Sequence, residues 1–173
     1  QSLWCKRMCG IVGYIGHRSA LPIVIEALKR LEYRGYDSSG TALIHNGELQ
    51  VYKKKGKIIE LERSLPEPSK CDSNIAIAHT RWATHGEPNE INAHPHTDCS
   101  NSLAIVHNGI IENYKVLKQQ LIELGHVFRS DTDSEVLAHL IEQFTKSENK
   151  LEDAVREAMK RVEGTYGLVV IDQ

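Results

Sequence analysis

The sequence lacks the features that mark several broad classes of protein. No apolar run approaches the roughly 20 residues that a membrane-spanning helix needs, and the stretch before Met8 lacks the apolar core of a signal peptide. The net charge is only −2, from 21 lysines and arginines against 23 aspartates and glutamates. Nothing in this balance favours nucleic acid or an anionic membrane as a partner. The sequence therefore predicts a cytoplasmic protein with neither kind of partner.

Cysteine is scarce, and its spacing fits no known framework. The four cysteines, Cys5, Cys9, Cys71 and Cys99, form no CxxC pair, so reduced thiols are expected rather than disulfides. Five histidines are close in sequence, namely His79, His85, His94, His96 and His107. Imidazole is a common zinc ligand, but no HExxH or CxxC spacing accompanies them, so no metal site is predicted. Glycines at 10, 13 and 16 do not fit GxGxxG, and no dinucleotide cofactor is expected.

The hydrophobic pattern predicts a single α+β domain, because 173 residues with 40% hydrophobic content suffice for one core. Strands are expected over residues 10–16, 41–45, 49–53, 74–79, 102–107 and 165–172. Helices are expected over residues 20–33, 57–65 and 114–124, from a capping box at 132–135 to residue 144, and over 151–162. Asn46-Gly47 predicts a two-residue hairpin turn. Residues 80–101 show little periodicity, and long irregular segments are often functional.

The pairing of Met8-Cys9-Gly10 with His107-Asn108-Gly109 carries the most chemical information. A cysteine that follows a removable methionine can become an N-terminal residue, and it then has its own base. The α-amino group titrates at about 7.7–8.0 and the thiol at about 8.5, so the amine can accept the thiol proton. The Asn108 side-chain amide and the Gly109 backbone N–H can stabilise a developing oxyanion. These residue types point to acyl transfer from an amide substrate.

Six sequence blocks occur in a fixed order: CGIVGYIG from residue 9, LEYRGYDSSG from 31, HTRWATHG from 79, NAHPH from 92, HNG from 107 and SDTDSE from 130. Together they resemble the glutaminase domain of the glutamine–fructose-6-phosphate aminotransferases, a branch of the class II glutamine amidotransferases. The second and third blocks resemble this hexosamine branch more than the amidophosphoribosyltransferases or asparagine synthetases. The resemblance runs from Cys9 almost to the last residue. It implies an N-terminal-nucleophile hydrolase fold, a four-layer αββα sandwich, and neither metal nor cofactor for the glutamine half reaction.

The resemblance also implies a role for each matched residue. Cys9 would attack the glutamine side-chain amide, with Asn108 and Gly109 as the oxyanion donors. Arg81 would bind the α-carboxylate of L-glutamine and Asp133 its α-ammonium group. Trp82, Thr84 and His85 would belong to a loop that folds over glutamine. Arg34 would lie close to the nucleophile.

Several of these residues also have a purely structural interpretation. Cys9 is also typical of a small buried residue at a strand start, and Asn108-Gly109 of a hairpin turn. Trp82 is also typical of a core residue, and Asp133 of a helix start favoured by the dipole. Arg34 could form an ion pair with Asp37 or Glu32.

The resemblance further predicts how the chain is organised. Residues 1–8 are expected to be a non-native or unprocessed extension, with Cys9 exposed when Met8 is removed. Residues 9–173 are expected to be a glutaminase domain truncated at its C-terminal end, without the isomerase domain that binds fructose 6-phosphate. The expected function is the glutamine-hydrolysing half of a glucosamine-6-phosphate synthase, homodimeric at full length. The alternatives are the glutaminase half of another class II amidotransferase, such as amidophosphoribosyltransferase, and a non-catalytic glutamine-binding module with Cys9 blocked.

Overall fold

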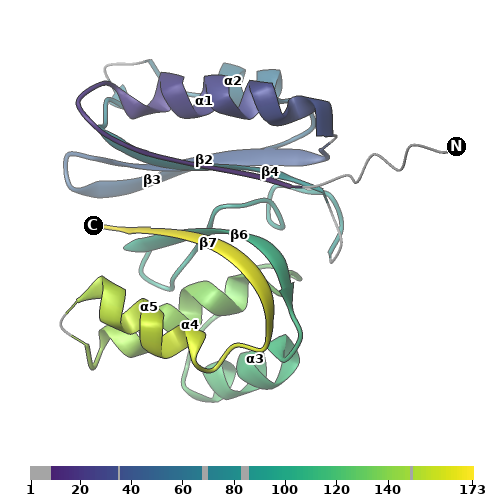
Figure 1. The fold of residues 1–173 in the computed structure, drawn as a ribbon, viewed down its shortest axis with the longest axis vertical. Coiled ribbons are helices and arrows are strands. Elements are labelled where there is room, and N and C mark those ends of the chain that lie inside the picture. The colour runs from purple at the N-terminus through teal and green to yellow at the C-terminus, as the bar shows by residue number, and fades with distance from the viewer. Residues whose placement is uncertain (1–8, 35, 68–69, 83–85, 149) are drawn as a thin grey trace, which may run out of the picture.

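Two antiparallel sheets lie face to face, and helices cover both outer faces (Figure 1). The computed structural model describes residues 9–34, 36–67, 70–82, 86–148 and 150–173. The first sheet has the order β1-β4-β2-β3, made of β1 (Gly10–Ile15), β2 (Ser38–His45), β3 (Glu48–Lys55) and β4 (Ile75–Arg81). The second sheet has the order β5-β6-β7, made of β5 (His96–Thr97), β6 (Leu103–Ile111) and β7 (Gly164–Asp172).

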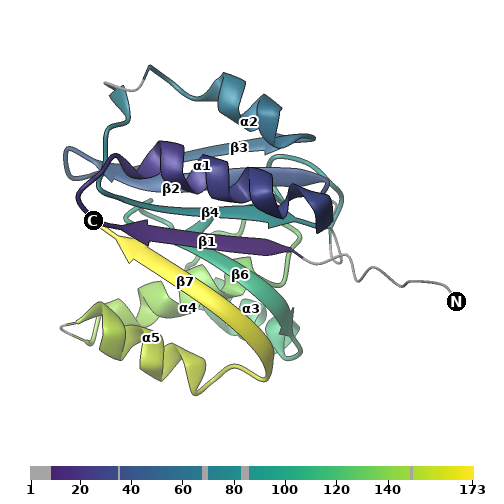
Figure 2. The same ribbon diagram turned by 45° about the horizontal axis from the view of Figure 1, so that its top comes forward.

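The helices form the two outer layers. Those over the first sheet are α1 (Ala20–Leu31), continued by the short 3-10 turn η1 (Glu32–Arg34), and α2 (Ile58–Ser64). Those over the second sheet are α3 (Tyr114–Glu123), α4 (Glu135–Thr145) and α5 (Leu151–Met159). Figure 2 shows β1 and β7 on the same side of the stack, with the helical layers outside. The α+β class and the αββα layering predicted from the sequence are therefore confirmed.

Three apolar clusters fill the three interfaces between these layers. One lies between α1, α2 and the first sheet, one between the two sheets, and one between the second sheet and α3 to α5. Strand β4 supplies two of them, because Ala76 and Ala78 pack toward α1 whereas Ile77 packs against the facing sheet. Each fully buried Leu or Ile side chain stabilises the fold by about 1.5–3 kcal/mol. No helix among the described residues is long and apolar enough to cross a membrane.

The predicted elements are all present, with informative differences at their ends. The predicted turn at Asn46-Gly47 joins β2 to β3, with both residues at positive φ, 52° and 78°. The same dipeptide at 108–109 is not a turn, because β6 continues through it to Ile111 and pairs with β7. Strand β4 extends to Arg81, so the start of the supposedly irregular segment belongs to the sheet. Helix α5 ends at Met159, earlier than predicted.

The predicted capping box is only half formed. The hydroxyl of Thr132 accepts a hydrogen bond from the Glu135 N–H at 3.4 Å, as a cap would. The Glu135 carboxylate instead accepts the backbone N–H groups of Arg129 and Ser130, at 2.8 and 2.6 Å. Glu135 therefore organises the segment before α4 and holds the start of that helix in place.

Four buried histidines lie close together: His79, His94, His96 and His107. The rings of His79 and His94 stack at 4.2 Å, and His94 meets His96 edge-on at 4.6 Å. Burial lowers the pKa of His79 to about 4, and it lowers the pKa of each of the other three below its usual range. These imidazoles therefore stay uncharged at neutral pH, and each makes a hydrogen bond as a neutral ring.

We expect the free energy of unfolding to fall steeply as the pH drops from about 6.5 toward about 4. An unfolded histidine titrates at about 6.5, so in this window the unfolded chain binds protons that the folded chain refuses. Each such proton contributes a slope of about 1.4 kcal/mol per pH unit. The free energy of unfolding can be measured with urea at a series of pH values. Its slope near pH 5.5 should correspond to an uptake of roughly two or more protons on unfolding. An uptake below about one proton would contradict this explanation.

Candidate active site

Cys9 lies immediately before β1, at the end of the first sheet where β1 pairs with β4. The Trp82 backbone brackets its sulfur: the Trp82 N–H donates to Sγ at 3.1 Å, and the thiol donates to the Trp82 carbonyl at 3.6 Å. The next residue is fixed as well, since the Gly10 N–H donates to Thr80 Oγ1 at 3.0 Å. A side chain at position 10 would lie 2.7 Å from Leu31, so glycine lets the strand approach α1 closely.

Burial raises the pKa of the Cys9 thiol, although the Trp82 N–H and the positive charge of Arg81 oppose the shift. The thiol is therefore mostly protonated near neutral pH, and an attack on an amide carbon needs a base close to the sulfur. A free α-amino group on the same residue would be such a base.

Asn108 reaches Cys9 from the other sheet. Its Nδ2 donates to the Cys9 carbonyl oxygen at 3.0 Å, so its Oδ1 faces the opposite way, toward His79. His79 Nε2 lies 2.7 Å from that Oδ1 and must carry the ring proton, because an amide oxygen only accepts. His79 on β4 thus fixes the direction of the Asn108 amide on β6. The sequence analysis considered His79 only as a metal ligand and missed this positioning role.

Gly109 follows Asn108 in β6 and pairs there with Tyr166 of β7. Its φ is 137°, in the region that favours glycine, and a Cβ would lie 1.9 Å from the Thr165 carbonyl oxygen. Both the φ angle and the contact with the Thr165 carbonyl oxygen belong to the backbone, so no side chain can move away to make room for a Cβ. Glycine is therefore required here for β6 and β7 to pair next to Asn108.

Replacement of Gly109 by alanine is expected to lower the free energy of unfolding by about 2–3 kcal/mol, because strain adds to the contact with Thr165. Gly47→Ala is the control, since Gly47 also has a positive φ, 78°, but nothing lies within 4 Å of the added methyl group. It should cost only about 1 kcal/mol. Chemical denaturation of both variants measures the difference, and equal losses would show that the contact with Thr165 is irrelevant.

Arg81 is buried at the end of β4, with its charge only 4.0 Å from an Asp37 oxygen. Its guanidinium also donates to the carbonyl oxygens of Gly86 and Glu87, at 3.2 and 3.4 Å. Burial lowers the pKa of Arg81, whereas the charges of Asp37, Cys9 and Asp133 oppose that shift. Arg81 therefore shares an electrostatic environment with the nucleophile candidate and with Asp133. Asp37, one of the two partners considered for Arg34, lies next to Arg81.

Asp133 lies just before α4, and its Oδ2 accepts the Ile111 N–H at 2.8 Å. One carboxylate oxygen thus anchors the end of β6, while the charge acts on Arg81 and His107. This agrees with both interpretations of Asp133, as a helix-start residue and as an acceptor for a cationic group.

Of the predicted site residues, Thr84, His85 and the Arg34 side chain lie outside the described part of the chain. Trp82 contacts the nucleophile candidate through its backbone.

Comparisons with known proteins agree with the resemblance carried by the six sequence blocks. The family described as "Glutamine amidotransferase domain" matches residues 79–173. Glutamine–fructose-6-phosphate aminotransferase (isomerizing) of Pyrococcus horikoshii is 55% identical over 164 residues, covering 95% of this chain and 27% of that protein. The enzyme of the same name from Bacteroides thetaiotaomicron is 55% identical over 169 residues, covering 96% of this chain and 27% of its own length.

A solved structure provides the corresponding comparison in three dimensions. Glutamine phosphoribosylpyrophosphate amidotransferase from B. subtilis, complexed with ADP and GMP, superposes with a TM-score of 0.78 at 31% sequence identity. The match covers 94% of this chain and 35% of that one. The chain thus spans 27% of the two curated relatives and a similar minority of the solved enzyme.

Proposed function

Because the chain belongs to the glutamine amidotransferase family, we propose that it hydrolyses the side-chain amide of L-glutamine with Cys9 as the nucleophile. One observation carries the proposal. The amide of Asn108, oriented by His79, lies 3.0 Å from the Cys9 carbonyl oxygen, across the gap between the two sheets. A hydrogen-bond donor fixed beside a cysteine is the arrangement that an acyl-transfer site needs.

The proposed reaction starts from Cys9 with a free α-amino group, after cleavage of the Met8–Cys9 peptide bond. The amine takes the thiol proton, and Sγ attacks the amide carbon of glutamine to form a tetrahedral oxyanion. Asn108 Nδ2 and the Gly109 N–H donate to that oxygen. The protonated amine then gives its proton to the leaving nitrogen, and ammonia departs as the thioester forms. Water attacks the thioester, again with the amine as base, to release glutamate and restore the thiol.

Recognition of glutamine requires one group for each charge on its α-carbon. A guanidinium binds a carboxylate through two parallel hydrogen bonds, which suits Arg81, and a carboxylate accepts an ammonium group, which suits Asp133. In the described structure Arg81 holds the carbonyl groups of Gly86 and Glu87. We infer that glutamine exchanges places with this loop segment, and that Trp82, Thr84 and His85 then cover the substrate. Arg34 is proposed as a residue close to the nucleophile.

For the whole protein we propose the activity named for the curated relatives, with ammonia passed to fructose 6-phosphate in a fused isomerase domain. At 55% identity the relatives from P. horikoshii and B. thetaiotaomicron favour this activity over that of an amidophosphoribosyltransferase, for which the structural match is 31% identical. A cytoplasmic location is proposed because a nucleophilic thiol must stay reduced. A homodimer at full length stays a prediction that size-exclusion chromatography with light scattering would check.

The experiment that tests the proposed function is intact-mass spectrometry of the protein from its native cell, after exposure to 6-diazo-5-oxo-norleucine. This electrophilic analogue of glutamine alkylates a cysteine that binds glutamine. Loss of residues 1–8 together with a single adduct on Cys9 supports the proposal. An intact Gln1 terminus without adduct favours the non-catalytic module with Cys9 blocked. Product analysis with fructose 6-phosphate or phosphoribosylpyrophosphate as the acceptor then separates the two amidotransferase alternatives.

A further inference from the structure

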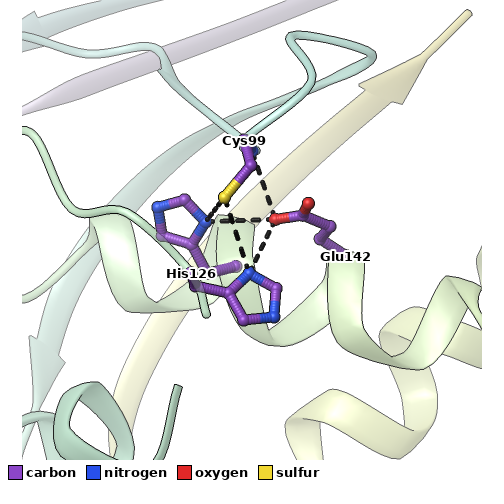
Figure 3. Close-up of side chains that lie close together, drawn as sticks. Cys99, His126 and Glu142 are labelled. Carbon is purple, nitrogen blue, oxygen red and sulfur yellow. Dashed lines mark hydrogen bonds and ion pairs between the residues drawn. The ribbon is translucent and has the colours of Figure 1, made fainter. Parts of the chain in front are cut away.

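A second cluster of reactive side chains lies far from Cys9, at the C-terminal half of α4. It consists of Cys99, His126, His139 and Glu142, and one ligand atom from each lies within 4.8 Å of all the others. Figure 3 shows Cys99, His126 and Glu142 pointing toward one another. The two histidines are buried, and the other two residues are partly buried. Only the pair on α4, three residues apart, has a helical spacing, so the sequence analysis missed the cluster.

Four of the six distances between ligand atoms in this cluster are close to those around a tetrahedral metal ion, and all six are within 4.8 Å. Cys99 Sγ lies 3.7 Å from His126 Nδ1 and 3.5 Å from His139 Nδ1. Zinc–sulfur and zinc–nitrogen bonds of about 2.3 and 2.0–2.1 Å at a tetrahedral angle place sulfur and nitrogen about 3.5 Å apart. Glu142 Oε2 lies 2.9 and 3.1 Å from the two Nδ1 atoms, which is slightly less than the roughly 3.3 Å of an ideal site. Small shifts of the side chains would therefore complete the tetrahedron.

The outer nitrogen of each ring faces an oxygen. His126 Nε2 lies 3.0 Å from Gln143 Oε1, and that oxygen also accepts from Lys146 Nζ at 3.0 Å, which fixes the direction of the amide. His139 Nε2 lies 3.5 Å from Glu135 Oε1, close enough for electrostatic attraction but without a hydrogen bond. The acceptor beside His126 and the carboxylate charge beside His139 favour a proton on Nε2, and a neutral ring then presents the lone pair of Nδ1 to the centre. Metal-binding histidines are oriented by acceptors in this way.

The centre of the cluster is then short of protons. Two backbone groups donate into the cluster: the Cys99 N–H to Glu142 Oε2 at 3.2 Å and the Val127 N–H to Cys99 Sγ at 3.5 Å. For the contacts among the four side chains themselves, two Nδ1 lone pairs and a carboxylate meet, and the Cys99 thiol supplies a single proton. A divalent cation removes this conflict, because it is attracted by all four atoms at once.

We propose that Cys99, His126, His139 and Glu142 bind one zinc ion. Sulfur, imidazole and carboxylate ligands in a four-coordinate arrangement are typical of zinc. On binding, the Cys99 S–H bond breaks, its proton leaves to solvent, and the thiolate forms the zinc–sulfur bond. The charge of the thiolate and the carboxylate then balances that of Zn²⁺. No redox change is involved.

A zinc ion here would fasten three segments that are distant in sequence. Cys99 follows β5, His126 follows α3, and the other two ligands lie on α4. Glu135, next to His139, also holds Arg129 and Ser130 just before α4. The site would therefore stabilise the helix that begins beside Asp133, and its role would be structural, since all four positions are filled by protein ligands.

The test is metal binding by the full chain in a Cys9→Ala background, so that zinc on the nucleophile candidate is not counted. After removal of metal with a chelator, titration against a chromophoric competitor should give one tightly bound zinc, with release of roughly one proton. Zinc in about hundredfold excess over its Kd should raise Tm by roughly 5–10 °C. Co²⁺ in place of zinc should show a sulfur-to-metal charge-transfer band and the intense visible bands of a tetrahedral site.

Two variants and one control distinguish this site from adventitious binding. Cys99→Ser should abolish the charge-transfer band, and Glu142→Gln should weaken zinc binding about 10²-fold while keeping an acceptor for the Cys99 N–H. Cys71→Ser, which changes a buried thiol under α1, should leave zinc binding unchanged. A folded Cys9→Ala protein that binds no zinc, or binds it equally well with Glu142→Gln in place, overturns the proposal. This outcome would not affect the proposed hydrolysis of glutamine.

Discussion

Replacement of Cys9 by alanine is expected to reduce the turnover of glutamine about 10⁵-fold or more, to the background of the assay. The reason is that no other described thiol lies beside the Asn108 amide, since Cys71 is buried under α1 and Cys99 belongs to the second cluster. Glutamate release measured with the processed protein, whose residue 9 is N-terminal, gives the effect directly.

Cys71→Ala is the matched control for this prediction. It removes another thiol of the same chain from a core cluster, where van der Waals contacts and weak hydrogen bonds to the Pro66 and Glu67 carbonyl oxygens are lost. Its thermal stability should fall while kcat stays within a factor of about 3, because no group near Cys9 changes. Substantial glutamate release by the Cys9→Ala protein would assign the nucleophile elsewhere and remove the basis of the proposed mechanism.

The sequence predicts most of the scaffold because its signals are local. Apolar residues at helical spacing predict α1, α3 and α4, and alternating or continuous apolar runs predict the strands. Asn46-Gly47 predicts its turn because both residues adopt positive φ at little cost and nothing else competes for that backbone.

The same dipeptide at 108–109 has a different outcome, and the cause is not local. Here β7 pairs along the whole of β6, so Gly109 adopts its unusual φ inside a strand rather than in a turn. A pairing partner more than fifty residues away decides the conformation. The preference of Asn-Gly for turns therefore does not predict the conformation at this position, which depends on the pairing of β6 with β7.

The contacts that position the candidate site residues cannot be predicted from local sequence patterns either. His79 lies on β4 of the first sheet and Asn108 on β6 of the second, and their hydrogen bond exists only because the sheets stack face to face. The second cluster joins two loops to one helix face in the same way. In both cases the residue types were visible in the sequence, but which of them meet is a property of the packed layers.

Replacement of Asn108 by alanine is expected to lower kcat for glutamine about 10²–10³-fold, as for the loss of one oxyanion donor, with a much smaller change in KM. The described hydrogen bonds of its side chain are to Cys9 and His79, rather than to Arg81 or Asp133, the residues proposed to bind the two charges of glutamine. Alkylation of Cys9 by a small electrophile should persist, which separates lost chemistry from lost folding.

Asn113→Ala is the control for that variant. Asn113 also uses both ends of its amide, donating to the Arg161 carbonyl and accepting from the Glu163 N–H, but it does so at the start of α3, away from Cys9. Its loss should lower Tm and leave kcat nearly unchanged. If Asn113→Ala reduced kcat as much as Asn108→Ala, the effect at 108 would be one of stability.

A double-mutant cycle between His79 and Asn108 then tests how the amide is held. If His79 acts by orienting Asn108, His79→Ala should lower kcat by less than Asn108→Ala, and the double variant should be no slower than Asn108→Ala alone. Multiplying effects in the double variant would instead mean that His79 contributes to turnover independently of the amide. The cycle is informative because the 2.7 Å contact is the hydrogen bond that joins the two side chains, whereas the stacking of His79 on His94 is lost equally whether or not Asn108 is present.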